Sequence, residues 1–166
     1  MLKGIRFAVL TISDRSARGE RADASGPLLA SIVRENGGDA VHIAILPDER
    51  AAIRAELEAV ADSGSVDIIL TTGGTGFAPR DVTPEATRDV LDKEAPGLAE
   101  AMRAESQKKT GTAMLSRAVA GIRKATLIIN LPGSPKAARE NLEVVLPALA
   151  HAVELIKGRV GDCGKP

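Results

Sequence analysis

The chain has 166 residues and a mass of 17.2 kDa, and its 22 Lys+Arg residues balance 22 Asp+Glu residues, so its formal net charge is zero. This length suits one domain with a substantial core, and a neutral chain lacks the basic surface typical of nucleic-acid-binding proteins. With two Phe and no Trp or Tyr, we expect an aliphatic core in which both Phe residues pack, and no nucleic acid as a partner.

The N-terminal sequence and the cysteine content indicate the cellular compartment. The apolar stretch over residues 7–12 is too short, and too closely followed by charge, for a signal peptide or a membrane span. Cys163 is the only cysteine, so an internal disulfide is excluded. We expect a cytoplasmic protein with no membrane partner, with one domain over residues 1–158 and a mobile C-terminal tail over residues 159–166.

In chain order, short aliphatic segments alternate with longer segments rich in Ala, Leu, Glu and Arg. The short segments are nearly continuous in apolar character, as in strands buried on both faces of a sheet, and cover residues 5–12, 40–46, 66–72 and 126–131. Residues 116–122 are predicted to form a hairpin with the last of them, turning near residues 123–124.

The longer segments carry helix start signals. Predicted helices begin near Ser25, Pro47, Thr83 and Ser134. Pro147 falls inside the last of these and is expected to kink or split it. The alternation predicts a three-layer α/β fold, with a mostly parallel sheet, helices on both faces and one antiparallel strand.

Polar or glycine-rich loops follow the four predicted parallel strands. The carboxyl ends of parallel strands share one edge of a sheet, which is where open α/β sheets bind ligands. The loop after the third strand consists of Gly73, Gly74, Thr75 and Gly76. Glycines allow backbone N–H groups to approach an anion, but the Lys-Ser/Thr ending of a Walker A loop is missing. Phosphate binding and a purely structural turn both remain open.

Three aspartates lie in separate loops, and each has a local explanation. Asp48 could cap a helix, Asp14 could cap a helix or stabilise a turn, and Asp81 could pair with Arg80. Carboxylates gathered at one edge would instead attract a divalent cation, and an arginine offers a planar fork for phosphate oxygens. The residues alone do not decide between these interpretations.

The remaining polar candidates are less specific. Ser134 suits a helix N-cap, Ser116 begins a predicted strand, and Asn130 ends a buried strand, where its amide needs a partner from a loop or a ligand. His42 and His151 have no Cys or His at metal-ligand spacing, so we interpret both as structural or surface residues.

Taken together, these motifs resemble the MogA/MoaB family of molybdenum-cofactor biosynthesis proteins, the molybdopterin adenylyltransferases. The chain is also similar to the adenylyltransferase domain of plant and animal two-domain proteins. The resemblance covers residues 7–158 through TISDRSARGERADASGPLL, ILPDE, TTGGTGFAPRDVTPEAT, APGLAEAMR, AMLSRAVAGIRKATLIINLPGSP and LPALAHAVELIKG. The glycine loop also occurs in molybdenum-insertion domains and CinA-like proteins, whereas LSRAVAGIR and LIINLPGSP favour the adenylyltransferase branch.

This resemblance implies a homotrimer that transfers AMP from ATP to the terminal phosphate of molybdopterin, with Mg²⁺ as cofactor and pyrophosphate as the second product. It implies catalytic and metal-binding roles for Asp48 and Asp81. It implies substrate contacts from Ser13, Asp14, Gly73, Gly74, Thr75, Gly76, Arg80, Ser116, Asn130, Pro132, Gly133 and Ser134. Two alternatives stay open: a non-catalytic molybdopterin-binding protein of the same fold, and a CinA-related pyrophosphate hydrolase.

Overall fold

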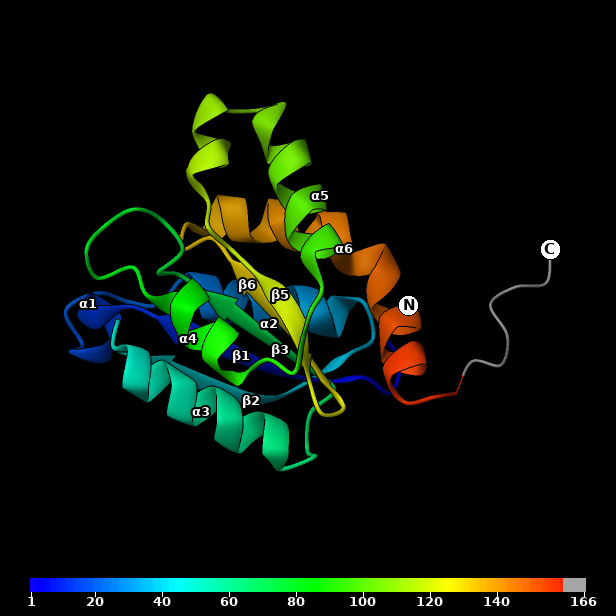
Figure 1. The fold of residues 1–166 in the computed structure, drawn as a ribbon. Coiled ribbons are helices and arrows are strands. Elements are labelled where there is room, and N and C mark those ends of the chain that lie inside the picture. Colours follow the sequence, from blue (N-terminus) through cyan, green and yellow to red (C-terminus); the bar gives the residue numbers. More distant parts are fainter. Residues whose placement is uncertain (160–166) are drawn as a thin grey trace.

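The computed structural model describes residues 1–159, whose six strands form one mixed sheet between two layers of helices (Figure 1). Across the sheet the order is β2 (Asp39–Leu46), β1 (Arg6–Ile12), β3 (Ile68–Thr72), β6 (Thr126–Leu131), β5 (Ala120–Arg123) and β4 (Lys93–Glu94). The first four strands are parallel, and β5 runs antiparallel to both of its neighbours. The predicted three-layer fold with one antiparallel strand is confirmed.

Helices cover both faces of the sheet. One face packs against α2 (Ser25–Glu35), α5 (Pro96–Gln107) and α6 (Pro135–Ile156), and the other against α3 (Arg50–Asp62) and α4 (Thr83–Val90). The short helix α1 (Asp14–Ala17) and the 3₁₀ helix η1 (Gly111–Leu115) lie in loops. Helix α5, η1 and β4 lie outside the predicted elements. Among the described helices, none has the length and apolar character needed to cross a membrane.

The central strands are buried on both faces, which explains their continuous apolar sequences. In β1, Phe7 and Val9 pack towards α2 and α6, whereas Ala8 and Leu10 pack towards α3 and α4. The expectation that both Phe residues pack is confirmed for Phe7 and is wrong for Phe77, which lies in the loop after β3 with 68% of its surface exposed.

The edge strand β2 departs from its prediction. Its residues alternate between exposed and half-buried, and Val41, Ile43 and Ile45 are 54%, 46% and 42% exposed. The expectation that residues 40–46 are buried on both faces is therefore wrong. An edge strand has only one neighbouring strand, and the helical layers do not cover these outward side chains.

Two further predictions are corrected near the C-terminus. Of the predicted kink or split at Pro147, the split is wrong, because α6 continues as one helix of 22 residues. Proline removes one backbone hydrogen bond, while the buried Leu146 and Leu149 anchor the adjoining turns to the sheet. The β5–β6 hairpin is confirmed, although β5 begins at Ala120 rather than at residue 116. Residues 160–166 of the predicted tail, which include Cys163, lie outside the described residues.

Candidate active site

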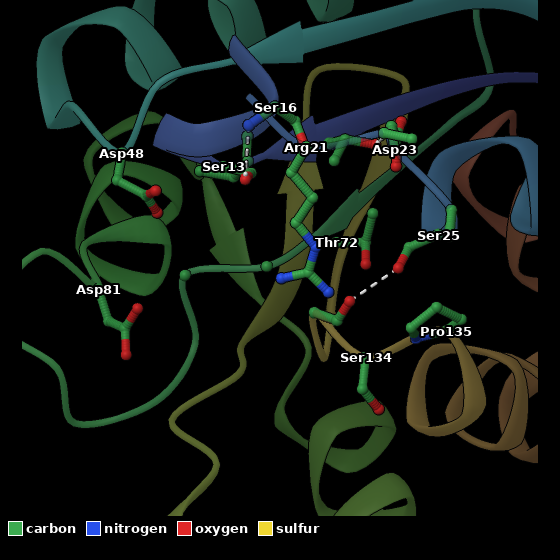
Figure 2. A pocket seen from close by; sticks show the side chains of 17 residues that line it. Ser13, Ser16, Arg21, Asp23, Ser25, Asp48, Thr72, Asp81, Ser134 and Pro135 are labelled. Atoms are coloured by element: carbon green, nitrogen blue, oxygen red, sulfur yellow. Dashed lines mark hydrogen bonds between the residues drawn. The ribbon is translucent and has the colours of Figure 1, made fainter. Parts of the chain in front are cut away.

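The loops that follow β1, β2, β3 and β6 surround a cavity of about 360 Å³ at the carboxyl edge of the sheet (Figure 2). This convergence is the arrangement that the parallel strands predict. Of the residues proposed from the sequence, those that line the cavity are Ser13, Asp48, Gly73, Gly74, Asp81, Gly133 and Ser134.

The glycine turn after β3 brings its backbone against the ends of neighbouring elements. Gly73 and Gly74 have φ angles of +106° and +66°, which side-chain-bearing residues rarely adopt. A Cβ atom on Gly73 would collide with the carbonyl oxygen of Ile12, and one on Gly74 would collide with the hydroxyl of Thr83. The same position on Gly74 lies 3.1 Å from Oδ1 of Asp48. The turn therefore requires glycine at both positions and places backbone directly beside a carboxylate.

Asp14 and Asp48 join the loops after β1 and β2 by reciprocal hydrogen bonds. The backbone N–H of Asp14 donates to Oδ2 of Asp48 at 2.8 Å, and the backbone N–H of Asp48 donates to Oδ1 of Asp14 at 3.0 Å. Neither carboxylate caps a helix; α1 is capped by Ser13, whose Oγ accepts from the N–H of Ser16. The N-cap interpretation of both aspartates is therefore wrong.

Arg80 is bound to Asp14 and not to its sequence neighbour Asp81. Its Nε lies 2.5 Å from Oδ2 of Asp14, and its Nη2 lies 3.0 Å from Oδ1. This forked pair connects the 73–81 loop to the loop after β1, and it holds the pKa of Asp14 below its usual range. Arg80 and Asp14 do not line the cavity. Their pair instead connects two of the loops that surround it.

Asp48 has the opposite electrostatic environment. Burial raises its pKa, the Asp14 N–H opposes that rise, and the negative charges of Asp14 and Asp81 add to it. Asp81 faces the same cavity from the 73–81 loop, and its Oδ2 accepts from the N–H of Ala78 at 2.9 Å. A cation between these carboxylates would relieve their unfavourable charge.

Asn130 is placed beneath the cavity. It is fully buried, and its amide donates to the hydroxyls of Thr71 and Thr87, both at 2.9 Å, while its Oδ1 accepts from the N–H of Val119 at 3.2 Å. Its partners thus come from neighbouring elements. Asn130 therefore supports the strand ends, and its contact with substrate stays a prediction.

The other residues proposed from the sequence lie around the cavity without lining it. Thr75 is buried, and the backbone of Gly76 is held by Arg117, whose Nε donates to the carbonyl of Gly76 at 2.8 Å. Arg117 also donates to the carbonyl of Asp81 at 2.7 Å and pairs with Glu85. Through these contacts with its backbone, Arg117 stabilises the 73–81 loop.

Ser116 and Pro132 belong to neighbouring hollows. Ser116 lines a second cavity of about 330 Å³ and, with Pro132, a third of about 250 Å³. The carbonyl of Pro132 accepts from the hydroxyl of Thr72 at 2.7 Å. Ser116 is therefore not part of the cavity that holds the two aspartates.

The sequence did not single out several residues that line this cavity. Ser25 begins α2, and its hydroxyl donates to the carbonyl of Gly133 at 2.7 Å. Asp23 accepts from the hydroxyl of Thr11 at 2.7 Å. Arg21 lies in the same loop and points into the cavity (Figure 2). The loop between α1 and α2 lacks a periodic pattern, and its only sequence signal is its place in the first stretch that resembles the family.

A glycine turn and two carboxylates that line one cavity at the carboxyl edge of a mostly parallel sheet are typical of α/β proteins that bind phosphate-bearing ligands. Residues 8–151 match the family model described as a probable molybdopterin binding domain. The chain belongs to this family, and within it to the MogA/MoaB group.

Relatives and solved structures agree with this assignment. The chain is 45% identical to a molybdopterin adenylyltransferase of Helicobacter pylori strain J99, over 95% of this chain and 90% of that protein. It is 48% identical to the molybdenum cofactor synthesis protein cinnamon of Drosophila melanogaster, but spans only 26% of it. The MoaB structure from Thermus thermophilus superposes with a TM-score of 0.88 at 51% identity, over 93% of this chain and 97% of that one.

A CinA protein from Thermoplasma acidophilum shares the fold, with a TM-score of 0.68 over 87% of this chain and 97% of that one. Its sequence identity is 15%. This likeness concerns the fold alone.

Proposed function

We propose that this chain is a molybdopterin adenylyltransferase, which transfers AMP from ATP to the terminal phosphate of molybdopterin and releases pyrophosphate. Relatives that carry this name are 42–45% identical over 85–95% of the chain. The observation that carries the proposal is the placement of Asp48 and Asp81 around one cavity beside the Gly73–Gly74 turn.

The chemistry suits these residue types. The nucleophile is an oxygen of a phosphate monoester, which is already anionic near neutral pH, so no strong general base is needed. This oxygen forms a bond to the α-phosphorus of ATP, and the bond from that phosphorus to the bridging oxygen of the β-phosphate breaks. The electron pair leaves with pyrophosphate.

The main obstacle is repulsion between two polyanions, which the protein must offset. The backbone of Gly73 and Gly74 can approach phosphate oxygens because no side chain intervenes. Helices α2 and α6 begin at the cavity with Ser25 and Pro135, so the positive ends of their dipoles favour a bound anion.

The two carboxylates fit Mg²⁺, which proteins often hold by one or two carboxylates together with substrate phosphates and water. In the described residues no group of three or more potential metal-ligating His, Cys, Asp or Glu side chains occurs. Asp48 and Asp81 would therefore supply only part of the coordination. Burial and the negative charges of Asp14 and Asp81 raise the pKa of Asp48, and a bound cation would relieve this unfavourable charge. Among residues 1–159, the buried hydroxyl of Thr83 finds no hydrogen-bond partner, and it lies beside Gly74. When bound, Mg²⁺ would neutralise negative charge on the polyphosphate.

The proposal is tested by incubating the protein with ATP, Mg²⁺ and molybdopterin and measuring adenylylated pterin by mass spectrometry. We expect product from the wild type, and a loss of at least about 100-fold in Asp48→Asn and Asp81→Asn, with pterin binding retained. Normal turnover in either variant would refute the metal-positioning role.

The same assay separates the alternatives. Pterin binding without adenylylated product would identify a non-catalytic binding protein. Pyrophosphate release from ATP in the absence of pterin would identify a hydrolase related to CinA.

The proposal includes a cytoplasmic homotrimer. Support for association comes from the apolar side chains of Val41, Ile43 and Ile45, which are exposed together on β2. Light scattering should give three times the chain mass of 17.2 kDa. A mass equal to that of one chain would contradict the trimer.

A further inference from the structure

Arg21 is an exposed side chain that lines the cavity and brings a positive charge to it. It lies in the loop between α1 and α2, and its guanidinium occupies the space between two groups of residues (Figure 2). On one side are the carboxylates of Asp48 and Asp81, and on the other are Ser25 and Ser134, at the starts of α2 and α6.

Three other arginines close to this region are paired with acidic side chains. Arg80 is paired with Asp14, Arg117 with Glu85, and Arg18, in the same loop as Arg21, with Glu20. Over residues 1–159, by contrast, the guanidinium of Arg21 makes no hydrogen bond or ion pair with the protein.

The nearby carboxylate of Asp23 is already occupied. Its Oδ2 accepts from the hydroxyl of Thr11 at 2.7 Å, and its Oδ1 accepts from the N–H of Gly26 at 3.0 Å. These bonds fix Asp23 against β1 and the first turn of α2. Arg21 is consequently left with its donors directed into the cavity, where an anionic ligand can receive them.

The charges of the cavity are divided between its two sides. Asp48 and Asp81 make one side suitable for a cation. On the opposite side, the N-termini of the 11-residue helix α2 and the 22-residue helix α6 favour anions, and Arg21 adds a full positive charge between them and the two carboxylates. A phosphate ester with a bound metal ion carries positive and negative charge. Its metal could contact the carboxylates while its phosphate contacts Arg21 and the helix N-termini.

We propose that Arg21 binds a phosphate oxyanion of the substrate in this cavity and thereby sets the affinity for a phosphate-bearing substrate, not the chemistry of the transfer. The inference rests on the proposed function for the identity of that substrate. The phosphate belongs either to the ATP triphosphate or to the molybdopterin monoester, and the two sources are separated by the test.

The test compares Arg21→Gln, Arg21→Lys and the matched control Arg18→Gln in the full chain. Arg18 lies in the same exposed loop but does not line the cavity. Calorimetry measures the binding of inorganic pyrophosphate, ATP and molybdopterin at two salt concentrations, and a steady-state assay measures kcat and KM. Thermal unfolding checks that each variant is folded.

We expect Arg21→Gln to weaken pyrophosphate binding about tenfold, since one charge-assisted contact is lost, and to reduce its salt dependence. Arg21→Lys should recover part of the affinity, and Arg18→Gln should bind as the wild type does. In the kinetic assay KM should rise about tenfold while kcat stays within about threefold. A rise confined to the KM of ATP assigns the triphosphate, and a rise confined to the KM of molybdopterin assigns the monoester.

Unchanged pyrophosphate affinity in Arg21→Gln, an equal loss in Arg18→Gln, or no pyrophosphate binding by the wild type would each overturn the inference. Because pyrophosphate binding does not require AMP transfer, the two proposals can fail separately. A wild type that binds pyrophosphate through Arg21 but forms no adenylylated pterin would refute only the proposed function. A wild type that forms product with unchanged KM values and pyrophosphate affinity in Arg21→Gln would refute only the role of Arg21.

Discussion

Two polar regions lie next to each other at the carboxyl edge of the sheet, and they differ in how their polar groups are satisfied. Around Asn130, a fully buried amide makes three hydrogen bonds to β3, α4 and the segment before β5. Around Asp48, a half-buried carboxylate retains a charge that its surroundings oppose. The first region stabilises the fold, and the second keeps an unfavourable charge that a ligand can neutralise.

The largest expected effect comes from the Asn130 region. Asn130→Leu removes the amide and leaves the hydroxyls of Thr71 and Thr87 and the N–H of Val119 without their partner. We expect a loss of about 3 kcal/mol in the free energy of unfolding, measured by urea denaturation.

Asn141→Leu is the matched control. Asn141 is also buried, but its amide donates only to Ser106 and to the carbonyl of Ala137 on its own helix. Its replacement should cost about 1 kcal/mol or less. Equal losses of unfolding free energy in the two variants would mean that the hydrogen bonds of Asn130 stabilise the fold no more than those of Asn141.

Thr83 lies between the two regions and gives a smaller effect of opposite sign. Its carbonyl accepts from the hydroxyl of Thr87 at 2.8 Å, while its own buried hydroxyl has no hydrogen-bond partner in the part of the chain that the structure describes. Thr83→Val keeps the shape and removes the unsatisfied hydroxyl, so the free energy of unfolding should rise by about 1 kcal/mol. A urea midpoint below that of the wild type would contradict this. A fall in AMP transfer in a stabilised variant would show that the hydroxyl serves the ligand.

Asp48→Asn should have the smallest effect on stability. It also distinguishes most clearly between the region around Asn130 and the region around Asp48. The amide oxygen can still accept from the N–H of Asp14, but the buried charge is gone, so stability at neutral pH should rise by at most about 1 kcal/mol. Added Mg²⁺ should stabilise the wild type more than this variant. A large loss of stability in Asp48→Asn would place Asp48 with Asn130 as a structural residue.

The pH dependence of Asp48→Asn has a defined sign. The pKa of Asp48 is raised in the folded state, mainly by burial, so its charge lowers stability above that pKa. The penalty disappears as the pH falls through the folded-state pKa, and the gain from Asp48→Asn should shrink over the same acidic range. Asp14 behaves oppositely: its pKa is lowered by Arg80, so its contribution is present above the unfolded-state pKa and is lost as the pH falls through the lowered value. Urea midpoints measured across this range check both signs.

Much of the fold follows from local sequence. The continuous apolar segments identify β1, β3 and β6, and the residues directly after them identify the edge at which Asp48, Asp81 and the glycine turn meet. The pattern fails for β2, because an aliphatic segment looks the same at the edge of a sheet as at its centre. Pro147 also does not split α6, because packing on the sheet outweighs one lost hydrogen bond.

The parts of the site that could not be predicted depend on contacts between distant residues. Arg80 and Asp14 are 66 positions apart, and Asn130 and Thr71 are 59 apart, so their pairing requires the finished sheet. The direction of Arg21 depends on the path of an irregular loop. A sequence can indicate which residue types could act, but only the assembled loops determine which ones face the ligand.

The place of β6 in the sheet has a consequence for how the protein is made. This strand, residues 126–131, inserts between β3 and β5, and Pro132 and Gly133 follow it directly. Until the ribosome has released these residues, the nascent chain exposes an unpaired edge of β3 and lacks one wall of its binding cavity. We therefore expect ligand binding to begin only after nearly the whole domain has been synthesised, and earlier chains to depend on chaperones.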